Sequence, residues 1–214
     1  MANEIQFLIS GIILGLAAGL SPGPLLALVF SETLRHGKRE GIKIAFAPII
    51  SDLPVIILVF LMLSRLAGYD YIIGAITLLG ACYLFYLGVE NLKARISDSM
   101  PEAKNVKSDA LVRGVIANLL NPHPYIFWLF IGGPVVFKSV DTDISAAAFF
   151  LFGFYGMLVG SKVCIALAVD KSSSFIRSSC YTYIVRALGF ALILFAMFFA
   201  AEGLRLVGLN VNLI

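Results

Sequence analysis

Long apolar runs alternate with short polar connections along nearly the whole chain. A hydrocarbon core of about 30 Å takes roughly 20 helical residues to cross, and six runs reach that length. They lie near residues 5–30, 41–63, 71–92, 111–136, 144–169 and 181–208. The pattern predicts an all-α integral membrane protein with six transmembrane helices. The first run is too long, too glycine-rich and too poor in flanking positive charge for a cleaved signal peptide, so we expect it to stay in the protein.

Composition agrees with a membrane protein and narrows its chemistry. The 214 residues are 60% hydrophobic and 14% charged, whereas soluble domains are about half apolar and about a quarter charged. The three cysteines, Cys82, Cys164 and Cys180, form no C-x-x-C pair, and no loop is rich in histidine. This argues against a disulfide framework, redox chemistry and a dedicated transition-metal site. No nucleophile is paired with a base, so we expect neither an enzyme nor a cofactor.

Positive charge is distributed unevenly between the connections. Twelve Lys and Arg residues lie in or beside the connections after the first, third and fifth runs, against three on the other side. The twelve are Arg35, Lys38, Arg39, Lys43, Lys93, Arg95, Lys104, Lys107, Arg113, Lys171, Arg177 and Arg186; the three are Arg65, Lys138 and Arg205. The positive-inside rule then places these connections in the cytoplasm and both termini outside the cytoplasmic membrane. The net charge of +3 follows from this bias and does not indicate a nucleic-acid partner.

The two halves of the chain look like copies of each other. SPGP at residues 21–24 and NPHP at residues 121–124 each open their half with a P-x-P behind a small polar residue, one hundred residues apart. The longest polar connection, residues 93–110, falls near the centre. Three spans per half is an odd number, so the second copy must be inverted. We expect inverted three-helix repeats at residues 1–92 and 111–214, joined by a cytoplasmic linker; the alternative is a chance P-x-P match.

The proline pairs predict breaks in the first and fourth spans. Proline removes a backbone donor and crowds the preceding turn, and the helix that restarts after it has amide groups with partial positive charge. Two breaks that meet near the bilayer centre would form a chamber suited to a carboxylate. The alternative is that the prolines only kink packed helices. The candidate residues are Pro22, Gly23, Pro24, Asn118, Asn121, Pro122 and His123.

Small residues on the first span have a simpler interpretation. Gly11, Gly15 and Gly19 recur every four residues, a spacing at which small residues commonly let a neighbouring helix approach. We therefore expect them to serve helix packing. His123 has two open interpretations, since it can titrate near neutral pH or act as a structural donor beside the prolines.

Two charged residues lie inside apolar runs. Asp52 lies in IISDLPVII at the centre of the second run, too deep for its carboxylate to reach the interface. It must be neutral, paired or facing water, and we favour a proton or cation site over a structural ion pair. Lys162 lies in VGSKVCIAL of the fifth run, about 10 Å from the cytoplasmic end. It is the candidate ion-pair partner of Asp52, although its side chain could also snorkel to the interface.

Four patterns together resemble the LysE/RhtB family of amino-acid exporters. They are G-x-x-x-G-x-x-x-G-x-x-P-G-P from Gly11 to Pro24, the Asp of the second span, G-x-x-Y-L-x-x-L-G from Gly80 to Gly88, and Asn-Pro at residues 121–122. The resemblance covers essentially the whole chain. It implies a secondary transporter that exports amino acids or similar small zwitterions across the cytoplasmic membrane, driven by protons or the membrane potential. Lipid, an amino acid and protons would be its partners, and a homo-oligomer stays open.

One departure from the family pattern bears on the substrate. In the family, Asn-Pro is more often followed by Lys, whereas His123 and Pro124 follow here. Two alternatives stay open: an exporter of a metal or other inorganic ion, which the same superfamily contains, and a membrane enzyme or scaffold that uses Asp52 and His123. If the substrate is an amino acid, the broken helix ends would bind its carboxylate, and Asp52 would bind its amino group or accept the coupling proton.

The charge distribution predicts the sidedness of the connections. A cysteine introduced at Ser97 or Ser172 should react with an impermeant maleimide only from the cytoplasm, and one introduced at Ala2 only from outside. Labelling of the Ala2→Cys variant from the cytoplasmic side would contradict both the topology and the inverted repeat.

Overall fold

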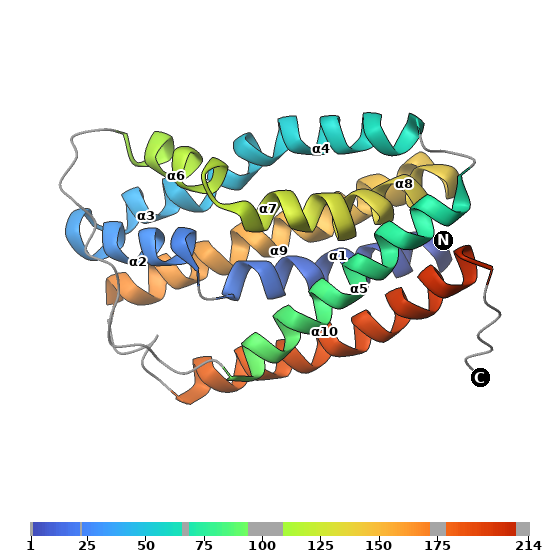
Figure 1. The fold of residues 1–214 in the computed structure, drawn as a ribbon. Helices are drawn as coiled ribbons and strands as arrows, with labels where there is room; N and C mark the ends of the chain where they lie inside the picture. Colours follow the sequence, from blue (N-terminus) through green and yellow to red (C-terminus); the bar gives the residue numbers. More distant parts are fainter. Residues whose placement is uncertain (1, 22, 66–68, 94–108, 172–178, 209–214) are drawn as a thin grey trace.

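The protein is all-helical in the part that the computed structural model describes, which is residues 2–21, 23–65, 69–93, 109–171 and 179–208 (Figure 1). The predicted all-α class is therefore confirmed. The helices are α1 (Ala2–Leu20), α2 (Pro24–His36), α3 (Lys38–Ala45), α4 (Ala47–Arg65), α5 (Asp70–Lys93), α6 (Ala110–Leu119), α7 (Pro122–Phe127), the π-helical turn η1 (Trp128–Gly132), α8 (Gly133–Thr142), α9 (Ile144–Lys171) and α10 (Ser179–Leu206).

Four stretches of the described helices are long and apolar enough to cross a bilayer. They are Lys38–Arg65, Asp70–Lys93, Ile144–Lys171 and Arg186–Leu206. The pair α1 and α2, whose axes differ by 61°, makes a fifth if it is counted as one broken span. The fourth run expected from the sequence is divided among α6, α7, η1 and α8, none of which is long enough alone. The protein is therefore a multi-pass membrane protein with four to five spans recognisable by length and composition.

Helices from the two halves pack against each other rather than forming separate bundles. Helix α1 lies along α9, α5 lies along α10, and α4 contacts both α6 and α8 (Figure 1). The main apolar core between them is built around Trp128, Phe150 and Phe154, all nearly inaccessible to solvent. Large apolar side chains such as Phe152 and Phe198 stay exposed on the outside. This distribution is expected where the surrounding solvent is hydrocarbon.

Glycines on α1 allow its backbone to approach α9 closely. A Cβ atom added at Gly11 would collide with the backbone carbonyl of Phe150, and one added at Gly15 with that of Phe154. At Gly19 it would collide with the Ser161 hydroxyl and lie 3.0 Å from the Leu158 carbonyl oxygen. All three contacts lie along one helix pair, so small residues set the distance between α1 and α9.

The α1–α9 contact predicts opposite effects for two Gly→Ala changes. Gly15→Ala should destabilise the protein by about 1–3 kcal/mol, because the new methyl group overpacks against the α9 backbone. Gly160→Ala, on α9 itself, is the matched control: apart from its chain neighbours and the nearby backbone of α9, no described atom lies within 4 Å of the added Cβ. Its better helix propensity should stabilise the fold by about 0.5–1 kcal/mol. Thermal unfolding in detergent measures both, and a Gly15→Ala protein as stable as the control would contradict the packing account.

Candidate functional site

A cavity of about 160 Å³ lies where the first and fourth predicted spans are interrupted. A single water needs about 10–15 Å³, so the space corresponds to roughly ten waters or one small organic solute. Apolar side chains such as Leu26 and Phe154 form part of its wall. Its polar lining residues are Ser21, Asp52, Tyr83, Glu90, Asn91, Asn118, Asn121, His123 and Lys162. A small apolar chamber with a few polar groups is the usual form of a ligand site.

The first helix interruption leaves one helix end open toward this cavity. Helix α1 ends at Leu20, and α2 begins at Pro24 behind Gly23, which has an extended backbone. No described side chain caps the N-terminus of α2, and its first turn contains no acidic residue. Gly23 and Pro24 both line the cavity. The partial positive charge of this helix end is therefore available to a ligand.

At the second interruption, side chains of the same segment hydrogen-bond the freed backbone groups. Helix α6 ends at Leu119, and α7 begins at Pro122. The Asn121 side-chain oxygen accepts a hydrogen bond from the His123 amide at 3.1 Å, while the Tyr125 hydroxyl donates to the Leu119 carbonyl at 2.8 Å. The N-terminus of α7 thus has a conventional Asn cap, in contrast to that of α2.

Asp52 is buried in a network that joins three helices. Its side chain on α4 is 4% exposed, and Oδ1 accepts a hydrogen bond of 2.8 Å from the Asn118 amide on α6. The same amide nitrogen lies 2.7 Å from the Ser51 hydroxyl. A longer contact of 3.3 Å runs from the Tyr155 hydroxyl on α9 to Oδ2. Asn118 therefore links Asp52 to the second half of the chain; we call these four residues the Asp52 network.

Lys162 binds the last carbonyl groups of α1. This lysine on α9 is 3% exposed, and its ammonium donates to the carbonyl oxygens of Gly19 at 2.9 Å and Ala18 at 3.3 Å. The last carbonyls of a helix lack intrahelical partners and have partial negative charge, which a cation compensates. The ion pairs formed by the described residues do not include one between Asp52 and Lys162. An exchange of partners between the two stays a prediction.

His123 faces the cavity together with a tyrosine from α5. The Tyr83 hydroxyl and the His123 Nδ1 atom are 2.7 Å apart. His123 is exposed, whereas Tyr83 is half-buried. This hydrogen bond ties α7, in the second half, to α5, in the first.

The structure brings most of the predicted site residues into one place. Gly23, Pro24, Asp52, Asn118, Asn121, His123 and Lys162 all line the cavity. Pro122 is the first residue of α7. Pro22 lies outside the described residues. The glycines at positions 11, 15 and 19 lie at the α1–α9 contact instead. Among the described residues, no group of three or more His, Cys, Asp and Glu could hold a metal ion.

Several residues of the cavity wall or of the Asp52 network were not identified from the sequence. Ser51 and Tyr155 belong to the Asp52 network, and Asn91 accepts a hydrogen bond of 3.2 Å from the Ser21 hydroxyl. The Asn91 amide nitrogen is buried without a hydrogen-bond partner among the described residues. Asn91 is a polar residue near the end of an apolar run, and Tyr83 is the tyrosine of G-x-x-Y-L-x-x-L-G. Both features could have identified these residues as candidates for the site.

Comparison with known proteins matches the chain to a family model and to proteins of two bacteria. The family model described as LysE type translocator matches residues 16–203. Chemotactic transduction protein ChpE of Pseudomonas aeruginosa is 29% identical over 175 residues, which cover 78% of this chain and 83% of that protein. Putative amino acid efflux protein YcgF of Bacillus subtilis is 20% identical over 210 residues, which cover 94% of this chain and 98% of that one. No solved structure gives a significant match.

The Asp52 network predicts unequal costs for removing its two donors to Asp52. Asn118→Leu should lower stability by about 1–3 kcal/mol, because it leaves the buried Asp52 and Ser51 oxygens without their shared donor. Tyr155→Phe should cost less, since its contact is long, and it serves as the comparison. Thermal unfolding of both variants in detergent is the measurement. Equal losses, or no loss with Asn118→Leu, would contradict the network.

Proposed function

Because the chain belongs to the LysE type translocator family, we propose that it is a secondary transporter that exports amino acids or similar small zwitterions across the cytoplasmic membrane. The observation that carries the proposal is the cavity between the interrupted helices, which joins an uncapped helix N-terminus to a buried carboxylate. The Bacillus subtilis relative is described as a putative amino acid efflux protein, which favours the same class of substrate here.

The transport fold that we propose has six spans in two inverted repeats. In such an arrangement the first span corresponds to the fourth, the second to the fifth and the third to the sixth. Contacts between helices support this correspondence: α1 lies against α9, and α6 and α8 lie against α4. Likewise, α1 contacts α10 while η1 contacts α5. Inverted repeats place the substrate at their interface, near the bilayer centre.

The two poles of a zwitterion would bind at different sides of the cavity. A carboxylate fits the N-terminus of α2, because the helix end has partial positive charge and no cap, and the Asn91 amide lies nearby with a donor still unused. Asp52 would bind the amino group or accept the coupling proton. A substrate cation at Asp52 would compensate a charge that is otherwise costly inside the membrane.

Proton coupling is the second part of the proposal. Asp52 is the candidate group, since it is buried, lines the cavity and is hydrogen-bonded to neutral donors rather than to a cation. His123, hydrogen-bonded to Tyr83 at the same cavity, is the second candidate for proton exchange there. Lys162 holds the α1 end in place and is available to Asp52 only if it leaves the Gly19 and Ala18 carbonyls.

Efflux from proteoliposomes tests the function directly. Purified protein is reconstituted with a labelled mixture of amino acids inside, and release is followed with and without an imposed proton gradient. We expect gradient-dependent release of one or a few amino acids. Turnover of a membrane substrate without any gradient-dependent flux would contradict transport and favour the enzyme alternative, and release only of divalent or other inorganic ions would contradict the proposed substrate.

Variants of Asp52 separate coupling from structure in the same assay. Asp52→Asn should leave the melting temperature near or above that of the wild type and abolish proton-coupled flux, because Asn has nearly the same shape but carries no charge or proton. Asp52→Asn with Lys162→Met is the comparison. If Asp52 only balanced Lys162, the single variant would lose stability and the double variant would regain both stability and flux; full proton-coupled flux in the double variant would contradict the coupling role.

A further inference from the structure

A second buried carboxylate lies outside the cavity, farther along α2. Glu32 is 1% exposed, and it follows the cavity residue Leu25 by about 10 Å of helix at 1.5 Å per residue. Nothing in the proposed substrate site uses it. An acidic side chain at this depth requires a charged or hydrogen-bonding partner.

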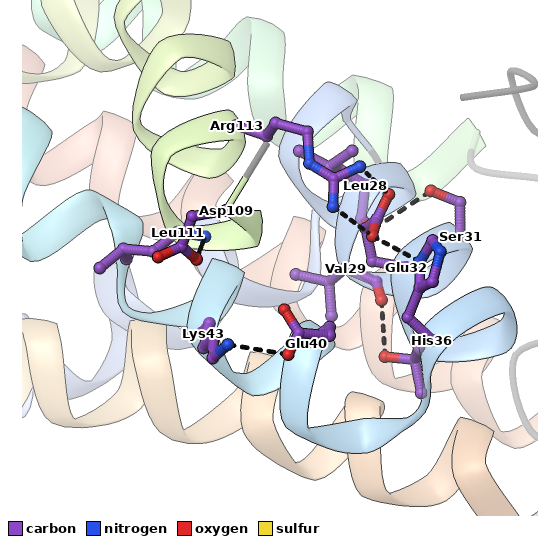
Figure 2. Close-up of polar contacts among 11 residues, drawn as sticks. Leu28, Val29, Ser31, Glu32, His36, Glu40, Lys43, Asp109, Leu111 and Arg113 are labelled. Carbon is purple, nitrogen blue, oxygen red and sulfur yellow. Dashed lines mark hydrogen bonds and ion pairs between the residues drawn. The ribbon is translucent and has the colours of Figure 1, made fainter. Parts of the chain in front are cut away.

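The partner is an arginine from the other half of the chain. Arg113 on α6 donates two parallel hydrogen bonds to Glu32, from Nη1 to Oε1 and from Nη2 to Oε2, each 2.7 Å long (Figure 2). His36 Nδ1, one turn along α2, lies 2.9 Å from Oε2. Such a two-pronged arginine–carboxylate pair is short, strong and specific in geometry. We call Glu32 and Arg113 the inner ion pair.

An apolar layer separates the inner ion pair from the cavity. Leu25, Val29 and Ile44 form one buried cluster with Ala110 and Ala166, drawn from α2, α3, α6 and α9. Leu25 lines the cavity, Val29 follows one turn later, and Glu32 comes after it. Water or solute moving along α2 from the cavity toward the His36 end would meet first this layer and then the ion pair.

The helices on the two sides of the inner ion pair come from different halves of the chain. Helices α2 and α3 form a tight hairpin around Gly37, whose φ of 87° favours glycine. A Cβ added at Gly41 would collide with the Thr33 hydroxyl, so the two helices are in close contact. Helix α6 belongs to the second half and carries Asn118 of the Asp52 network. Separation of α6 from the α2–α3 hairpin would therefore break the inner ion pair.

We infer that the Glu32–Arg113 pair is the latch of an inner gate, which closes the cavity toward the cytoplasm and breaks when α6 moves away from α2. The inference rests on the proposed transport function and on the topology that places the His36 end of α2 inside. Opening exposes both charges to cytoplasmic water, which hydrates them. A buried ion pair suits this task because the pair specifies one arrangement while its net contribution to stability is small.

Cysteine accessibility tests the gate without knowledge of the transported amino acid. Cys82, Cys164 and Cys180 are replaced by Ala, and Ser21→Cys supplies a reporter on the cavity wall. An impermeant maleimide is applied to inside-out vesicles, which expose the cytoplasmic face, and to intact cells, which expose the outer face. In the Glu32→Gln variant, labelling from the cytoplasmic face should rise by at least about tenfold, because the charged bonds that hold the gate are lost, while labelling from outside should stay equal or fall.

Two further variants control this result. Arg113→Lys should act like Glu32→Gln, since one ammonium cannot form both parallel bonds, and it provides the test if Glu32→Gln does not fold. Glu202→Gln removes one charge of the exposed Lys138–Glu202 pair, which is 2.6 Å long and joins α8 to α10. It should leave cytoplasmic labelling unchanged.

Different outcomes overturn different claims. Unchanged cytoplasmic labelling in both latch variants, or an equal rise from both faces together with a lower melting temperature, would refute the gate and leave a purely structural ion pair. If either result came from a protein that exports amino acids, only the gate would be refuted and the proposed function would remain. A selective cytoplasmic rise in a protein that moves no amino acid would support the gate and refute the proposed substrate.

Discussion

Hydrocarbon offers no hydrogen-bond partner, so every backbone group freed by a broken helix must be satisfied inside the protein. This constraint organises the centre of the structure. Lys162 binds the carbonyl oxygens of Gly19 and Ala18 at the end of α1, and Asn121 caps the start of α7. The start of α2 has no side-chain cap among the described residues, and it lies at the cavity. The helix start without a side-chain cap thus lies at the cavity that we propose as the substrate site.

Helix α6 connects the cavity to the end of the molecule that we assign to the cytoplasm. Asn118 near its C-terminus donates to Asp52, and Arg113 near its N-terminus pairs with Glu32. Both buried carboxylates of the first half therefore depend on one short helix of the second. In the transport cycle that we propose, protonation of Asp52 or arrival of a substrate amino group would change the Asn118 contact and so act on the helix that carries Arg113. This would link the proposed substrate site to the proposed gate.

The sequence predicts some levels of this structure better than others. The long apolar helices and the interior position of Asp52 follow from hydrophobic runs alone, because a buried charge in an apolar segment is conspicuous. The partners of Asp52 could not be predicted, since Asn118 and Tyr155 lie far away in sequence and only packing brings them together. The π-helical turn at Trp128–Gly132 leaves no periodicity signal. The role of Lys162 at the α1 end was likewise hidden, because its partners are backbone atoms.

The central claim is that the cavity between the helix breaks is the substrate site. Protection of a single cysteine at Ser21, on the cavity wall, tests it most directly. We predict that the exported amino acid slows maleimide labelling of this cysteine, with half-maximal protection near the concentration that half-saturates transport. Asp52→Asn should weaken the protection. Full-rate labelling in the presence of a saturating, transported amino acid would contradict the account.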